Sequence, residues 1–159
     1  MRSVSLLAVL VGVLSGERPQ GPLGREAVVA PQAALAAPLQ SDLDGAVAAF
    51  VRGWLEENLS DLAASMSADG IRLQTGGADH PVLPARQARA ALHDLLGSRT
   101  TRHLEVTRVV DLGGAPPRGF AELRWEAVVD RTSEALVHTV FVSFERDGTA
   151  WRINEIRVL

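Results

Sequence analysis

Apolar and polar residues alternate in three consecutive segments at the C-terminal end of the chain, over residues 119–131, 135–146 and 149–159. A period of two is typical of a β-strand with one buried face. The row that we expect to face the core in the first segment is Ala121, Leu123, Trp125, Ala127 and Val129. The corresponding row in the second is Leu136, His138, Val140, Val142 and Phe144. The pattern therefore predicts three antiparallel strands.

The last two strands are separated by residues 147–148, Asp-Gly, which favour a two-residue hairpin loop because both tolerate a positive φ. This loop would place Phe144 opposite Trp151. After Ile153 the alternation breaks, since residues 154–155 are both polar. One extra residue restores the face, as a β-bulge does, so we expect a bulge here, with a frayed strand end as the alternative.

A second, weaker turn at residues 132–133, Thr-Ser, separates the first two of these strands. It would place His138 opposite Ala127. Both predicted registers bring the apolar rows onto one face, and a slip of one residue would invert a strand. The agreement between the two turns supports a single sheet with one buried side.

Helical spacing of apolar residues dominates the chain before residue 100. It predicts three helices, at Ser41–Asn58 with Ser41 as its cap, Ser60–Ser67 capped by Ser60, and Pro84–Leu96. Extended segments are predicted at Ile71–Thr75, Pro81–Leu83 and His103–Leu112. Helices on one side of an antiparallel sheet give an α+β fold. We expect three N-terminal helices on a curved antiparallel sheet of four long strands plus one or two short ones.

The N-terminal 40 residues differ in composition from the rest. Residues 1–16 combine one arginine with a short apolar run, which is typical of an export signal and too short to span a bilayer comfortably. An uncleaved anchor or a misassigned start is the alternative. Residues 17–40 are rich in Pro, Gly and Ala without a sustained period, which indicates a flexible linker or processed leader. Residues 41–159 would form one domain of an exported protein, with no membrane span in the mature chain.

Composition excludes several chemistries. All sixteen basic residues are arginine, and the chain contains no lysine, cysteine or tyrosine. A Schiff-base lysine, a cysteine nucleophile, a disulfide, a thiolate metal site and a tyrosine acid are therefore excluded. The net charge of −3 gives no basic surface for nucleic acid. We expect no cofactor and no nucleic-acid partner.

Two titratable residues fall in apolar rows. His138 beside small Ala127 would have space around it, and a histidine in an apolar cleft can act as a general base near neutral pH. The alternative is a core-edge histidine with one hydrogen bond. Arg108 lies in the row of Leu104, Val106, Val110 and Leu112, where it would need a carboxylate or a bound anion. The alternatives are a structural ion pair and a bulge that turns it outward.

Other candidates have simpler explanations. Trp54, Trp125 and Trp151 would line a ligand pocket or, as their spacing suggests, pack in the core. Residues 79–80, Asp-His, form a metal pair without a third ligand at suitable spacing. The outward row of Val137, Thr139 and Phe141 is apolar enough to indicate a surface for a second copy of the chain.

The element order resembles the nuclear transport factor two-like superfamily, the cone-shaped fold that includes SnoaL-like and ketosteroid-isomerase-like proteins. The matching stretches lie within residues 39–159: the opening helix Leu43–Asn58, the segment Leu62–Leu73, the helix Pro84–Leu96 and the ending Trp151–Val158. The chain looks most like small exported bacterial members of unknown function. The resemblance implies pairing through the sheet in many relatives. Isomerase-type members rely on a tyrosine and carboxylic acids, and tyrosine is absent here.

The sequence therefore favours a domain that binds a small molecule or a partner in the concave face of its sheet without catalysis, through Arg108, Trp125, His138 and Trp54. One alternative is a cone-fold enzyme of the isomerase, dehydratase or cyclase type, with His138 as acid or base and Arg108 stabilising negative charge. A second is a structural homodimer module whose pocket is filled by its own side chains. An open pocket touching His138 or Arg108 distinguishes the first two from the third.

Overall fold

A computed structural model describes residues 33–76 and 78–159, with side chains for residues 42–76 and 81–159. The predicted export signal and most of the predicted leader lie outside the described residues. No helix in the described part is long and apolar enough to cross a membrane.

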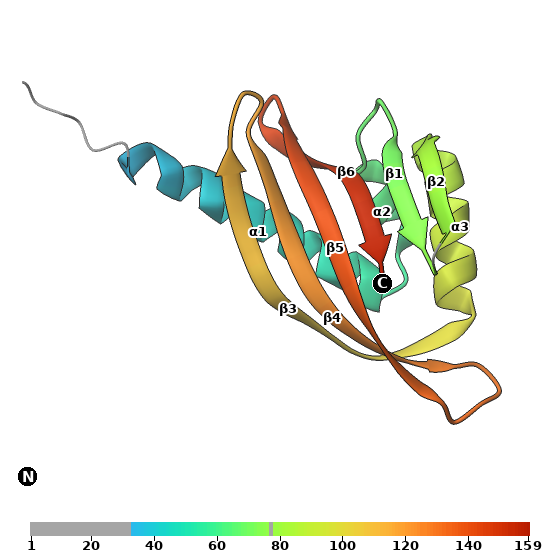
Figure 1. The fold of residues 1–159 in the computed structure, drawn as a ribbon. Helices are drawn as coiled ribbons and strands as arrows, with labels where there is room; N and C mark the ends of the chain where they lie inside the picture. Colours follow the sequence, from blue (N-terminus) through green and yellow to red (C-terminus); the bar gives the residue numbers. More distant parts are fainter. Residues whose placement is uncertain (1–32, 77) are drawn as a thin grey trace, which may run out of the picture. The chain divides into compact units, whose positions relative to one another are not determined.

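Helices and strands follow in the predicted α+β order, and the helices lie on one side of a curved six-stranded sheet (Figure 1). The helices are α1 (Ala33–Leu55), α2 (Leu59–Ala64) and α3 (Ala85–Gly97). The strands are β1 (Ile71–Thr75), β2 (Ala78–Leu83), β3 (Arg99–Gly113), β4 (Arg118–Val129), β5 (Ala135–Asp147) and β6 (Ala150–Val158). We call the side of the sheet that faces the helices inner and the opposite side outer.

The N-terminal boundaries of the first two helices differ from the prediction. Helix α1 begins at Ala33, within the segment predicted as linker, so Ser41 lies inside the helix and does not cap it. Helix α2 is capped by Asn58, whose Oδ1 accepts a hydrogen bond from the backbone N–H of Asp61 at 3.3 Å, and not by Ser60. The apolar face of α1 is as predicted, since its core residues recur every three or four positions: Leu43, Val47, Phe50 and Trp54.

The strands are ordered β2-β1-β6-β5-β4-β3. All neighbours are antiparallel, as predicted, except β1 and β6, which are parallel and make the sheet mixed. A parallel pair cannot be joined by a tight turn. Here the chain leaves β1 through β2, α3 and the three long strands before it returns beside β1 as β6.

Both predicted hairpin registers are wrong by two residues. The β5–β6 loop is Gly148-Thr149, with Gly148 at φ +59°, and Phe144 faces Ile153. Strand β4 ends at Val129 and β5 begins at Ala135, so the β4–β5 connection is longer than a two-residue turn. His138 faces Trp125 in consequence. Because a shift of two residues keeps each side chain on its face, the apolar rows still meet.

The predicted bulge in β6 is present at Asn154. Ser143 pairs with Glu155 and Phe144 with Ile153, which leaves Asn154 as the extra residue. The bulge keeps the residues on both sides of it in the core: Ile153, Ile156 and Val158 are at most 2% exposed. Toward its start, β6 pairs with the segment that follows α2, on the same edge that later pairs with β1. There the N–H of Ser67 donates a hydrogen bond to the carbonyl of Ile153 at 2.8 Å.

The core lies between the inner face of the sheet and the three helices. No polar or charged residue is buried in it, among the side chains that the structure describes. The largest fully buried side chains are Trp54, Trp125, Phe50 and Phe144.

Candidate functional site

The inner face brings together three of the residues predicted from the sequence. Trp54 of α1 and Trp125 of β4 meet edge to face, with ring centroids 5.2 Å apart. The ring of His138 lies 5.1 Å from that of Trp125 at 31°. Both tryptophans are 0% exposed, and His138 is half-buried. These residues form a continuous aromatic contact at the edge of the core.

Two further residues complete this cluster, and the sequence did not identify them. The Nε1–H of Trp125 donates to Oγ1 of Thr101 at 3.0 Å, and the guanidinium of Arg99 lies 6.0 Å from the Trp125 ring centroid. Arg99 also donates to the carbonyl of Leu95 at 3.2 Å. Both residues belong to the start of β3, which was predicted to begin only at His103, so no strand row was available to place them.

Nitrogen atoms within this cluster are buried without a hydrogen-bond partner in the described protein: Trp54 Nε1, Arg99 Nε and His138 Nε2. An unpaired buried donor costs about 1–3 kcal/mol. Three of the cavities lined by described residues include neither His138 nor Arg108.

Arg108 does not lie in the apolar row. The pairing of β3 with β4 shifts between Val106 and Arg108, which places Arg108 opposite Glu122 on the outer face. Its guanidinium lies 5.5 Å from the ring centroid of Phe120. Val109 packs against the core in the position predicted for Val110. The predicted inward placement of Arg108 is therefore wrong, and the bulge considered as an alternative is present.

Metal chemistry receives no support from the described residues. The side chains of residues 79–80 lie outside them, and no group of three or more potential ligands occurs among the rest.

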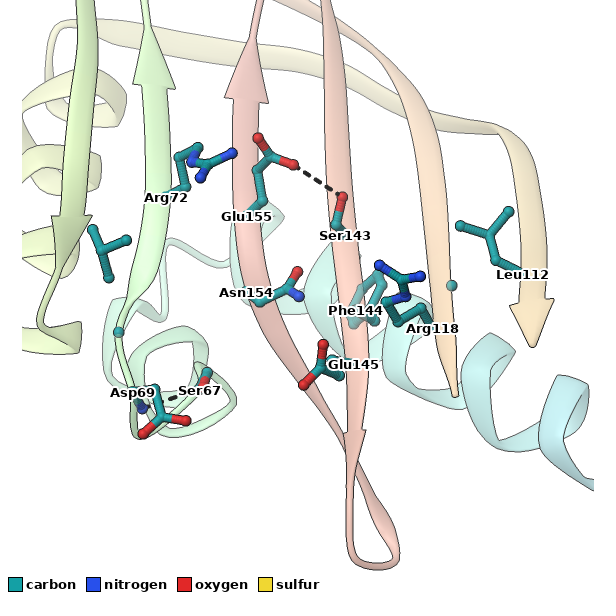
Figure 2. Close-up of a pocket in the computed structure, with 13 residues that line it drawn as sticks. Ser67, Asp69, Arg72, Leu112, Arg118, Ser143, Phe144, Glu145, Asn154 and Glu155 are labelled. Atoms are coloured by element: carbon teal, nitrogen blue, oxygen red, sulfur yellow. Dashed lines mark hydrogen bonds between the residues drawn. The ribbon is translucent and has the colours of Figure 1, made fainter. Parts of the chain in front are cut away.

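An open groove of about 440 Å³ crosses the outer face of the sheet at the β6 bulge (Figure 2). We call it the bulge groove. Its wall comes from β1, β6, β5 and β4, together with the turn before β1 and the ends of β2 and β3. The lining residues are Ser67, Asp69, Gly70, Arg72, Val82, Leu112, Arg118, Gly119, Ser143, Phe144, Glu145, Asn154 and Glu155.

Strand pairing fixes the polar groups of the bulge groove. Arg72 of β1 is the cross-strand neighbour of Glu155 on β6, and Arg118 of β4 is the neighbour of Glu145 on β5. Between these pairs, the hydroxyl of Ser143 donates to the Glu155 carboxylate at 3.3 Å.

Asn154 is central to the groove (Figure 2). Because it is the extra residue of the bulge, its side chain has no cross-strand partner in β5. Its Oδ1 is buried and accepts no hydrogen bond from the described residues. The groove therefore combines positive groups, negative groups and an unused acceptor, with the exposed apolar side chains of Val82 and Leu112 at the edge strands.

The sequence contained a partial signal for this site. The polar residues 154–155 predicted the bulge, and the alternation of β5 placed Ser143 in the outer row. The groove also requires β1 beside β6, and no turn joins those two strands. Arg72 and Arg118 therefore could not be assigned to a common site from the sequence.

Comparison with known proteins gives the fold. No protein-family model and no curated protein matches the chain. A DUF4783 family protein from Bacteroides uniformis superposes with a TM-score of 0.58 at 14% identity, over 69% of this chain and 92% of its own. An LEH-like epoxide hydrolase from M. tuberculosis superposes with a TM-score of 0.55 at 18% sequence identity. The match covers 76% of this chain and 84% of the hydrolase chain. An NTF-2 like protein of unknown function from Shewanella oneidensis superposes with a TM-score of 0.54 at 12% sequence identity. The match covers 74% of this chain and 96% of the Shewanella chain.

These solved structures include an enzyme and proteins without an assigned activity, so their likeness gives architecture and leaves function open. The chain has the nuclear transport factor two-like fold.

Proposed function

We propose that this protein is a small-molecule-binding domain without catalysis of its own, and that its ligand occupies the bulge groove. The observation that supports this is a cavity of about 440 Å³ lined by charged groups that have no ion-pair partner in the described protein. Sites for small molecules usually measure roughly 300–1,000 Å³ and combine apolar walls with a few polar groups.

This proposal moves the ligand from the inner face, where the sequence predicted it, to the outer face. The inner positions Trp54 and Trp125 are fully buried, and Trp125 covers one side of His138. A ligand there would have to displace packed aromatic side chains. The bulge groove is already open.

Binding without turnover is supported by the composition of the groove. Its lining contains no histidine among the residues with described side chains, and the hydroxyl of Ser143 contacts only a carboxylate, so these residues do not assemble a nucleophile activated by an imidazole. Catalysis by His138 would require a separate site on the inner face.

A plugging variant tests the location. Ser143 and Val137 lie in the same outer row of β5, but only Ser143 lines the groove. We would screen the full-length chain by saturation-transfer NMR against separate panels of sugars, nucleosides, carboxylic acids, amines and amino acids. We expect at least one compound to bind the wild type and Val137→Trp with equal affinity, and Ser143→Trp at least tenfold more weakly.

Two results would contradict the proposal. One is the absence of binding by every panel at millimolar concentration. The other is binding that Ser143→Trp leaves unchanged, which would place the ligand elsewhere on the molecule.

A further inference from the structure

Building on the proposed function, we propose that the bulge groove selects small zwitterions of the amino-acid type, which have an ammonium and a carboxylate on one short skeleton. The groove offers both charges side by side, and neither is neutralised within the described protein.

Two arginine–glutamate neighbours form the charged part of the groove. Opposite charges on neighbouring strands usually attract each other, with Cβ atoms about 5 Å apart. Here Arg72 and Glu155 are neighbours, as are Arg118 and Glu145, yet neither pair forms an ion pair within 4.0 Å in the described structure. Arg118 lies between β4 and β5, whereas the Glu145 carboxylate points to the other side of β5, toward β6 (Figure 2).

Glu145 has a second arginine neighbour that is engaged elsewhere. Arg152 of β6 pairs with Glu145 in the strand register, but its guanidinium donates to the carbonyl of Ala64 at 2.9 Å. The half-buried Glu145 carboxylate is thus left without a cationic partner among the described residues. It can accept hydrogen bonds from an ammonium group, which is a donor only.

Asn154 provides the matching acceptor. Its Oδ1 is buried and unpaired, and its side chain lies on the strand next to Glu145 (Figure 2). If the Asn154 amide turns its buried Oδ1 toward the groove, an ammonium placed between Asn154 and Glu145 satisfies this oxygen and the carboxylate together. The carboxylate of the same molecule would then face Arg118, whose fork of N–H donors suits a carboxylate.

The mixture of charges argues against ligands of a single sign. Glu145, Glu155 and Asp69 would repel a phosphate or another anion, and the two arginines would repel a simple cation. The exposed side chains of Val82 and Leu112 line the groove at the edge strands β2 and β3, and each offers a hydrophobic surface to the rest of the molecule. A zwitterion with a short apolar side chain fits all three properties.

Derivatives that lack one charge provide the test. Each of the twenty free L-amino acids would be titrated into the full-length chain by calorimetry, and the tightest binder compared with its N-acetyl and C-amide forms. We expect either modification to weaken binding at least tenfold. Glu145→Gln should weaken binding of the free amino acid and of its C-amide, and leave binding of the N-acetyl form unchanged. Arg118→Gln should weaken binding of the free amino acid and of the N-acetyl form, and leave binding of the C-amide unchanged.

Arg86→Gln, an exposed arginine of α3 outside the groove, is the matched control and should leave all affinities unchanged. As a measurement that needs no variant, the side-chain amide signal of Asn154 in an NMR spectrum of the wild type should shift with the free amino acid. Circular dichroism confirms that each variant is folded.

The outcomes separate this inference from the proposed function. If no amino acid binds, but another panel compound binds in a manner sensitive to Ser143→Trp, the groove is a ligand site and its selectivity for zwitterions is wrong. Equal affinity for the free acid and its N-acetyl or amide form also overturns the selectivity. If no panel compound binds at all, both proposals are wrong.

Discussion

At the scale of single residues, substituting His138 tests whether the inner face only stabilises the fold or also binds a ligand. Its ring contacts Trp125, and such aromatic contacts contribute about 0.5–1.5 kcal/mol beyond the area that they bury. We expect His138→Ala to lower the free energy of unfolding by about 1–2 kcal/mol, measured by urea denaturation. Ligand binding in the bulge groove should not change.

His103→Ala is the control, because His103 lies on the outer side of β3 with its side chain 56% exposed. It should change stability by less than about 0.5 kcal/mol. If His138→Ala instead retained full stability and abolished binding or a turnover, the enzyme hypothesis based on His138 would replace the structural one.

Residue placement could be predicted where the alternation was regular. Trp125 and His138 were assigned correctly to the inner face because β4 and β5 contain no irregularity over their rows. Arg108 was not, because the segment around it has valines on both candidate faces: Val106, Val109 and Val110. A bulge between polar Thr107 and Arg108 leaves no clear trace in such a pattern.

At the scale of elements, alanine substitutions at two glycines, one facing α1 from the sheet and one within α1, should change the stability of the fold in opposite directions. Gly119 of β4 is buried, and a Cβ there would lie 2.5 Å from Cδ2 of Leu43 and 3.2 Å from the carbonyl of Val110. We expect Gly119→Ala to destabilise the fold by about 1–3 kcal/mol through overpacking.

Gly45 lies on the exposed side of α1, where a Cβ would meet nothing within 4 Å. Gly45→Ala should stabilise the helix by up to about 1 kcal/mol, because glycine is a poor helix former. Chemical denaturation of both variants measures whether the free energy of unfolding falls or rises in each. A neutral result at Gly119 would mean that α1 does not approach β4 as closely as described.

Element identity was more predictable than element pairing. Helices and strands were found from periodicity alone, because each repeats over several residues. Both hairpin registers were wrong, since the Asp147-Gly148 rule selected the wrong pair of loop residues and the β4–β5 connection is longer than Thr132-Ser133. The error moved no side chain to the other face of the sheet, because each register was shifted by two residues.

At the scale of the whole molecule, the outer sheet face is where the sequence predicts that two copies of the chain associate. The predicted interface row is less exposed at its centre than its sequence suggests. Arg157 lies 5.9 Å from the ring centroid of Phe141, and its Nε–H donates to Oε1 of Gln74 at 3.0 Å. Val137 in the same row is 58% exposed. The homodimer, like export, stays a prediction from the sequence.

Phe141→Glu tests the dimer without removing the fold, because the new carboxylate would lie beside Arg157 and form an ion pair in place of the present cation–π contact. We expect the wild type to sediment as a dimer at micromolar concentration and Phe141→Glu as a monomer with an unchanged circular dichroism spectrum. Leu55→Glu, at a 49% exposed apolar position on α1 away from the sheet, should remain dimeric. A monomeric wild type, or a dimer that persists in Phe141→Glu, would exclude this face as the interface.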